Sequence, residues 1–127
     1  MNVKRIIAAL AGISLAALPV VASAHGSTKP VHGGIVTMSG ETVVELVRAP
    51  KGVDIYLTEE DEPLAASGFA GKLIVTAAGA KNETALVPQA HNKLTAPGLK
   101  IPAGAKVVVS LTAKGNGAKT LASFTVK

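Results

Sequence analysis

The amino-acid sequence predicts an all-β protein of about seven to eight short antiparallel strands, arranged as a β-sandwich or an open barrel. From Gly34 onward, short runs rich in β-branched residues alternate with breaks that contain Gly or Pro, at intervals of about ten residues. Apolar and polar residues alternate within several of these runs, and no segment has a convincing helical period. Of the two arrangements we expect the sandwich, of about the size of an immunoglobulin domain.

Residues 1–24 are typical of a secretory signal peptide. Lys4 and Arg5 form a positive n-region, residues 6–21 form an apolar core, and small residues precede a cleavage point after Ala24. A membrane-spanning helix is disfavoured, because the apolar run is about 16 residues long, contains Gly and Pro, and a span needs about 20. We therefore expect export to the bacterial periplasm, with no membrane span after cleavage.

Removal of this leader changes what the composition implies. The chain has 127 residues, 48% apolar, with a formal charge of +5, but 17 apolar residues and two positive charges lie in the first 24 positions. The rest of the chain suits one small domain, which we place at residues 34–127. Its mild positive charge and its three aromatic residues do not favour nucleic acid as a partner. The absence of Cys excludes disulfides and thiolate metal sites.

Residues 25–33 contain Gly and Pro without a hydrophobic period, so we expect a flexible arm before the domain. Cleavage after Ala24 would make His25 the first residue, with a free α-amine beside its imidazole. These two groups together can chelate a divalent transition metal, and nitrogen ligands favour Cu(II). Ser27 occupies the third position, so the square-planar site that a third-position His would form is missing. The alternative interpretation of His25 is a frayed terminal residue.

The individual strands follow from the same pattern. Pro50 and Gly52 are placed for a tight turn, and Gly115 to Gly117 suit a hairpin loop with positive φ. In chain order, the expected strands are Ile35–Met38, Thr42–Arg48, Val53–Thr58, Lys72–Ala77, Glu83–Val87, a shorter one near Lys93–Ala96, Lys106–Ala113 and Leu121–Val126.

Alternation within the strands predicts which side chains face the core. The three apolar residues of Val53–Leu57 should point inward and Tyr56 outward, and Val44 and Leu46 are set against an outward Glu45 in the same way.

The segment Glu59–Ala70 is a longer connection that opens with four acidic residues. Pro63 argues against a continuous helix there, although Leu64–Gly68 can form one turn. The acidic run lacks the spacing and the Gly of a calcium loop, and we interpret it as a solvated loop.

The chain contains three histidines, and they are the candidate metal ligands. His25 and His32 lie on the arm, which contains Gly residues and can fold back, whereas His91 lies in a predicted loop. Imidazole is a common ligand for copper, zinc and nickel, so the amine and ring of His25 with the rings of His32 and His91 would form a complete Cu(II) site. Zinc or another divalent metal fits the same ligands. The alternative is that these are solvated loop histidines.

Several short motifs resemble those of small secreted bacterial proteins that are encoded with heavy-metal efflux systems. The motifs are His32-Gly33-Gly34, Glu45-Leu46-Val47, Ile55-Tyr56-Leu57, Pro63-Leu64, Asn92-Lys93-Leu94 and Phe124. The resemblance implies periplasmic handling of copper or a related divalent metal, with a component of a metal-efflux system as a partner. A looser resemblance, through the His-first mature chain alone, is to the periplasmic copper-resistance β-sandwich proteins.

An enzyme is not expected from these motifs. The sequence has no nucleophile elbow, no HExxH motif and no phosphate-binding loop. The preferred hypothesis is a periplasmic metal-binding protein. The alternative is a structural or interaction module without a metal, whose exposed strand edge pairs with a partner.

Overall fold

Strands form at all of the places where the alternating pattern predicts them. The computed structural model describes residues 27–127, so the expected leader at residues 1–24 and His25 lie outside the described residues. The strands are β1 (Ile35–Ser39), β2 (Thr42–Ala49), β3 (Gly52–Glu59), β4 (Glu62–Pro63), β5 (Phe69–Ala77), β6 (Ala80–Pro88), β7 (Lys93–Pro97), β8 (Lys106–Ala113) and β9 (Lys119–Thr125). The all-β prediction is confirmed, and β5 and β6 each begin three residues earlier than expected.

The connection between β3 and β5 contains the short strand β4, which the sequence pattern did not predict. Glu60 and Asp61 adopt left-handed conformations with φ of 51° and 65°, and this turn returns the chain so that β4 pairs with the end of β3. A single 3-10 turn follows at Ala66–Gly68, inside the segment where one helical turn was expected. Within residues 27–127, no helix has the length and apolar character needed to span a membrane.

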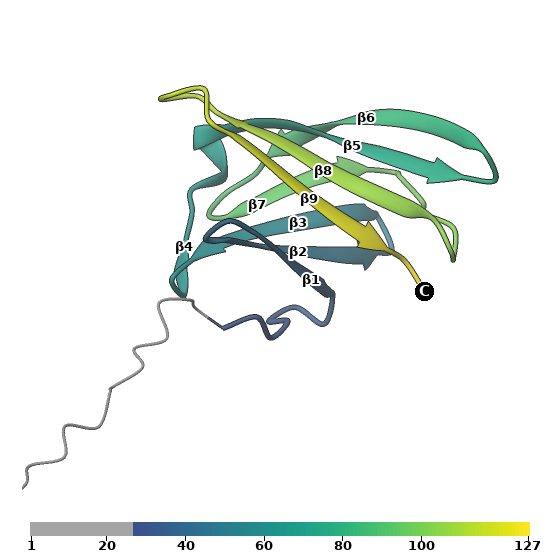
Figure 1. The fold of residues 1–127 in the computed structure, drawn as a ribbon, viewed down its shortest axis with the longest axis horizontal. Coiled ribbons are helices and arrows are strands. Elements are labelled where there is room, and N and C mark those ends of the chain that lie inside the picture. The colour runs from purple at the N-terminus through teal and green to yellow at the C-terminus, as the bar shows by residue number, and fades with distance from the viewer. Residues whose placement is uncertain (1–26) are drawn as a thin grey trace, which may run out of the picture.

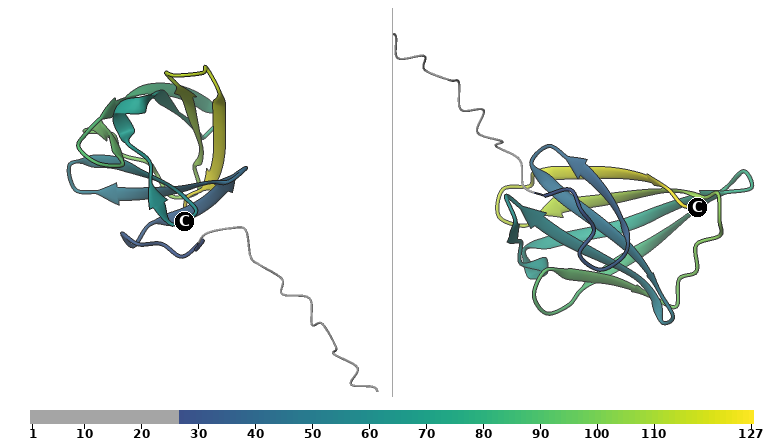
Figure 2. Two further views of the ribbon diagram at one scale, coloured as in Figure 1. Left: turned by 90° about the vertical axis from the view of Figure 1, so that its left-hand side faces the viewer. Right: turned by 90° about the horizontal axis from the view of Figure 1, so that it is seen from below.

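The strands are antiparallel and follow one hydrogen-bonded path in the order β1-β2-β3-β7-β6-β5-β8-β9. The path bends at β6, which pairs mainly with β5 and joins β7 only through Val87 and Pro88. It curls until the first and last strands approach each other, where the Thr37 hydroxyl donates a 3.0 Å hydrogen bond to the Ser123 carbonyl oxygen. The result is the nearly closed barrel of Figures 1 and 2. The expected sandwich is not confirmed, because the strands form one curled sheet.

The core fills the inside of this barrel. Inward and outward side chains alternate along the long strands as expected, so the apolar residues of β3 at positions 53, 55 and 57 are buried. Burying one such side chain stabilises the fold by about 1.5–3 kcal/mol. The largest fully buried side chains are Val44, Leu46, Val53, Ile55, Leu57, Leu73, Leu94, Val107, Val109, Leu111 and Val126.

The described part of the arm, residues 27–33, lies against the outer face of β2 and β3. The Ser27 backbone N–H donates a 2.6 Å hydrogen bond to Asp61 in the turn after β3. Farther along, the arm reaches the Glu45 side chain on β2. Figure 1 shows this segment running beneath β1, β2 and β3, on the side away from β5 and β6. The arm therefore covers a sheet face that alternation alone predicts to be solvated.

Candidate functional site

Glu45 is the residue around which the arm is organised. Its neighbours in β2, Val44 and Leu46, point into the core, so its own side chain points outward, yet Glu45 is only 5% exposed. The arm provides this burial because it passes very close to β2. At Gly34, an added Cβ would overlap the backbone carbonyl oxygen of Leu46, so only Gly allows this approach. Gly33 precedes it with a φ of +74°, which also favours Gly.

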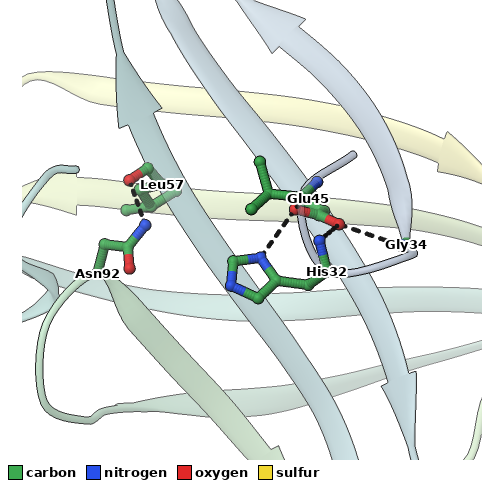
Figure 3. Close-up of polar contacts among 6 residues, drawn as sticks. His32, Gly34, Glu45, Leu57 and Asn92 are labelled. Atoms are coloured by element: carbon green, nitrogen blue, oxygen red, sulfur yellow. Dashed lines mark hydrogen bonds and ion pairs between the residues drawn. The ribbon is translucent and has the colours of Figure 1, made fainter. Parts of the chain in front are cut away.

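The Glu45 carboxylate accepts four hydrogen bonds from residues 31–34, where the arm joins the domain, two on each oxygen (Figure 3). Oε1 accepts from the backbone N–H groups of His32, at 2.8 Å, and Gly34, at 3.0 Å. Oε2 accepts from the backbone N–H of Val31, at 3.1 Å, and from Nδ1 of the His32 ring, at 3.0 Å. Hydrogen bonds to a charged acceptor are the stronger class, so these four contacts fix both the arm backbone and the imidazole.

The charge of Glu45 is stabilised by the same contacts. Burial by itself raises the pKa of this carboxyl, but the Gly34 N–H, the His32 ring and two further backbone N–H groups of the arm outweigh burial and hold the pKa below its usual value. Burial also raises the pKa of the neighbouring Tyr56 phenol, as do the negative charges of Asp54 and Glu45. At neutral pH the site therefore combines an ionised carboxylate with an uncharged phenol.

The His32 ring is fixed on two sides. It stacks on the Tyr56 ring, with 3.5 Å between the centroids and an angle of 8° between the planes. Because an ionised carboxylate can only accept hydrogen bonds, the contact with Glu45 assigns the proton of a neutral His32 ring to Nδ1. The Nε2 atom then carries a free lone pair, and the side chain is 37% exposed. Figure 3 shows this second nitrogen pointing away from Glu45, toward the side of Asn92.

An open cavity of about 390 Å³ lies beside this ring. It is lined by His32, Tyr56 and the loop from Gln89 to Lys93, which includes His91. The structure therefore places two of the three predicted metal ligands, 59 positions apart in the sequence, in the wall of one cavity. The third, His25, lies outside the described residues.

The loop that carries His91 is tied to β3 and to the 3-10 turn. His91 has a left-handed φ of 61°, and its carbonyl oxygen accepts a 2.8 Å hydrogen bond from the Ala66 N–H. Asn92 bonds to Leu57 twice: its carbonyl accepts from the Leu57 N–H at 3.1 Å, and its side-chain Nδ2 donates to the Leu57 carbonyl at 3.0 Å. These contacts hold the loop beside β3 and close one side of the cavity.

A second hollow, of about 310 Å³, shares His32, Tyr56 and Asn92 with the first and extends beneath the arm to Lys29 and Asp61. Nitrogen and oxygen atoms supply the polar lining of both hollows, which suits borderline or hard metal ions better than soft ones. Within residues 27–127, no group of three or more His, Cys, Asp or Glu side chains is arranged to hold a metal.

Sequence reasoning did not assign a site role to Glu45, Tyr56 or Asn92. Glu45 and Tyr56 are outward positions of two strands and Asn92 lies in a loop, so the sequence pattern gave no reason to place the three side chains together. All three nevertheless belong to the motifs that carry the family resemblance, as does the segment His32–Gly34. The structure brings these motif residues, which are up to 60 positions apart, to one place on the barrel.

Comparisons of the chain with protein-family models, with curated proteins and with solved structures find no match.

Proposed function

We propose that this chain is a periplasmic metal-binding protein that captures or passes on Cu(II), or a related divalent metal, as part of metal efflux or resistance. The observation that carries the proposal is the placement of His32. Its Nδ1 lies 3.0 Å from Oε2 of the buried Glu45 carboxylate, and His32 lines a cavity that His91 also lines.

This arrangement is the one that metal-binding histidines commonly have. A His that ligates through one ring nitrogen usually donates its other N–H to a carboxylate or carbonyl, which fixes the tautomer and increases the basicity of the ligating nitrogen. Here Glu45 would act as that outer partner and Nε2 of His32 as the ligand. Stacking on Tyr56 keeps the ring in place before any ion arrives, so little ordering is needed on binding.

The remaining ligands in the proposal come from His91 and from His25. His91 lies in the loop that lines the cavity with His32, and the mature N-terminus would add the amine and the imidazole of His25. Four nitrogen donors of this kind favour Cu(II), which stands at the top of the Irving–Williams order, and zinc fits the same set more weakly.

Capture without catalysis is the role we propose. A metal held by nitrogen ligands at the surface can be passed to a partner by ligand exchange, and a periplasmic component of an efflux system is the partner we propose. The proposal accounts for the exposed position of His32 on the arm.

The test is a Cu(II) titration of the secreted protein, after its mass has established that His25 is the first residue. The titration is repeated with His25→Ala, His32→Ala, His91→Ala and Glu45→Gln, and with Glu83→Gln as a matched control on the opposite side of the barrel. Loss of an outer-shell partner typically weakens metal binding about 10–100-fold, so Glu45→Gln should fall in that range and His32→Ala should lose at least as much. Equal affinities for the wild type, His25→Ala and His32→Ala would refute the proposal.

A second candidate function is strand addition, and the shape of β6 favours it. Among the described strands, residues 80–86 of β6 pair with β5 on one edge, and only Val87 and Pro88 pair on the other edge, with β7. The free edge can accept a strand from a partner. A partner that still binds in the presence of a chelator, and equally to His32→Ala, would favour this function over metal binding.

A further inference from the structure

The ionisable residues of the described chain are unevenly distributed. Residues 27–69 contain three basic and seven acidic residues, whereas residues 70–127 contain eight basic residues and one acidic residue. The first group includes β1 to β4, and the second includes β6 to β9 and all but the first residue of β5; of these, β7 pairs with β3 of the first group. The overall charge of the domain is therefore mild, although the two parts of the chain have opposite signs.

Four of the lysines belong to the outward face of the sheet formed by β6, β5, β8 and β9. Along one row, the register places Lys81 beside Thr76, Thr76 beside Lys106, and Lys106 beside Thr125. Toward the other end of the same face, Lys72 lies beside Ser110 of β8, and Lys119 of β9 lies beside Thr112. We call the surface with Lys72, Lys81, Lys106 and Lys119 the lysine face.

The centre of the lysine face is apolar. Ile74 and Val108 are neighbours in the register and are half-buried between the lysines. Leu121 and Val87, on the two outer strands of this face, are 59% and 45% exposed, although both are large apolar residues. The single acidic residue here, Glu83, forms a 3.2 Å ion pair with Lys72. The face thus combines a net positive charge with exposed apolar side chains.

The four lysines of the lysine face lie on strands across the barrel from the arm that carries His32, although the Val87 edge of this face is two residues from Gln89, which lines the His32 cavity. Figure 1 shows β5, β6 and β8 on one side and the arm beneath β1, β2 and β3 on the other. The end-on view in Figure 2 shows the same separation around the ring of strands. A surface that bound the four lysines would therefore approach the barrel from the side away from the arm.

We propose that the lysine face binds an anionic phospholipid surface. The positive charge of the lysine face favours a negatively charged partner. All of its cations are lysines, and Arg48, the one Arg within residues 27–127, lies on β2. Protein interfaces are enriched in Arg and depleted in Lys, but a layer of phospholipid headgroups attracts either cation as a point charge. Leu121 and Val87 would enter the boundary between headgroups and acyl chains. This inference does not depend on the proposed metal function.

The experiment is sedimentation of the secreted protein, freed of its leader as shown by mass, with lipid vesicles. The vesicles contain either phosphatidylcholine alone or phosphatidylcholine with about a third phosphatidylglycerol. The test variant is Lys106→Gln with Lys119→Gln. The matched control is Lys29→Gln with Lys51→Gln, which removes the same charge from exposed positions outside the lysine face. Thermal unfolding of each variant verifies that the fold is intact.

We expect binding to the anionic vesicles only, and release of the protein as the NaCl concentration rises toward 0.5 M because salt screens the attraction. The two lysines of the test variant should together account for about a 30-fold loss of partitioning, and the control should change it much less. Three results would overturn the proposal: no binding to anionic vesicles at low salt, equal losses in the test and control variants, or self-association without lipid that the test variant abolishes.

Discussion

Replacing Glu45 by Gln exchanges one carboxylate oxygen for an amide NH₂ group and should release the arm from the sheet. Each oxygen of Glu45 accepts two hydrogen bonds, from three backbone N–H groups and the His32 ring. The Gln side chain keeps one oxygen, so two bonds persist without the help of a negative charge. The NH₂ group cannot accept the other two: in place of Oε2 it faces the Val31 N–H and Nδ1 of the His32 ring, and in place of Oε1 it faces the N–H groups of His32 and Gly34.

The size of the effect follows from these contacts. A hydrogen bond to a charged group contributes about 1.5–3 kcal/mol and a neutral one about 1 kcal/mol, but an arm that leaves the sheet regains water for its N–H groups. The loss of unfolding free energy should therefore be about 1–3 kcal/mol. For a domain of this size, the Tm should fall by about 4–12 °C.

Two measurements check this prediction. Circular dichroism gives the Tm, and hydrogen exchange gives the protection of the His32 and Gly34 amides, which should be lost in Glu45→Gln. The control is Glu83→Gln, the same substitution at a half-exposed ion pair with Lys72, for which a change of about 0–1 kcal/mol is expected. Unchanged protection of the arm amides in Glu45→Gln, with an unchanged Tm, would refute the reasoning.

Two further predictions concern the same contact between arm and sheet. Gly34→Ala should expose the arm amides to hydrogen exchange as fully as Glu45→Gln does, because the new Cβ would overlap the Leu46 carbonyl oxygen. Gly68→Ala is the control, since no atom lies within 4 Å of the added Cβ there. Arm amides that stay protected in Gly34→Ala would contradict the close approach of the arm to β2. Acid should also weaken the contact: the pKa of Glu45 is lower in the folded state than its ordinary value of 4.5, so its contribution to stability is present above about pH 4.5 and is lost as the pH falls through the lowered value. The Tm difference between wild type and Glu45→Gln, measured from pH 7 to pH 2, should shrink as the pH falls below about 4.5. A difference that stays constant would show that the ionised Glu45 carboxylate is not the source of the stability difference.

Most of the secondary structure could be predicted because it depends on local patterns. Alternation along segments such as Lys106–Ala113 is enough to place a strand and to orient its side chains. The strand β4 was missed because its turn uses Glu60 and Asp61 in left-handed conformations, where a Gly would have been the recognisable signal. The choice between sandwich and barrel depends on two residue pairs between β6 and β7 and on the contact between β1 and β9, and none of these has a local signature.

The candidate site was predictable only in part. His32 and His91 stood out because the chain has few histidines, and the structure places both in the wall of one cavity. Glu45 could not be found in this way, because the alternation of inward and outward side chains along β2 assigns it to solvent. Its burial depends on a segment 11 to 14 positions earlier in the chain. The clue that was available was the paired glycines after His32, which allow a backbone to approach a sheet closely.

The contact between β1 and β9 also bears on how the chain reaches its native state. The hydrogen bond from Thr37 to Ser123 joins residues 86 positions apart, whereas β1–β2–β3, β5–β6 and β8–β9 are neighbouring strands that can form early as hairpins. A nascent chain that still lacks β9 exposes the unpaired edge of β8, which is a template for aggregation. Closure of the barrel must therefore wait until β9, the last of its strands in chain order, has been synthesised.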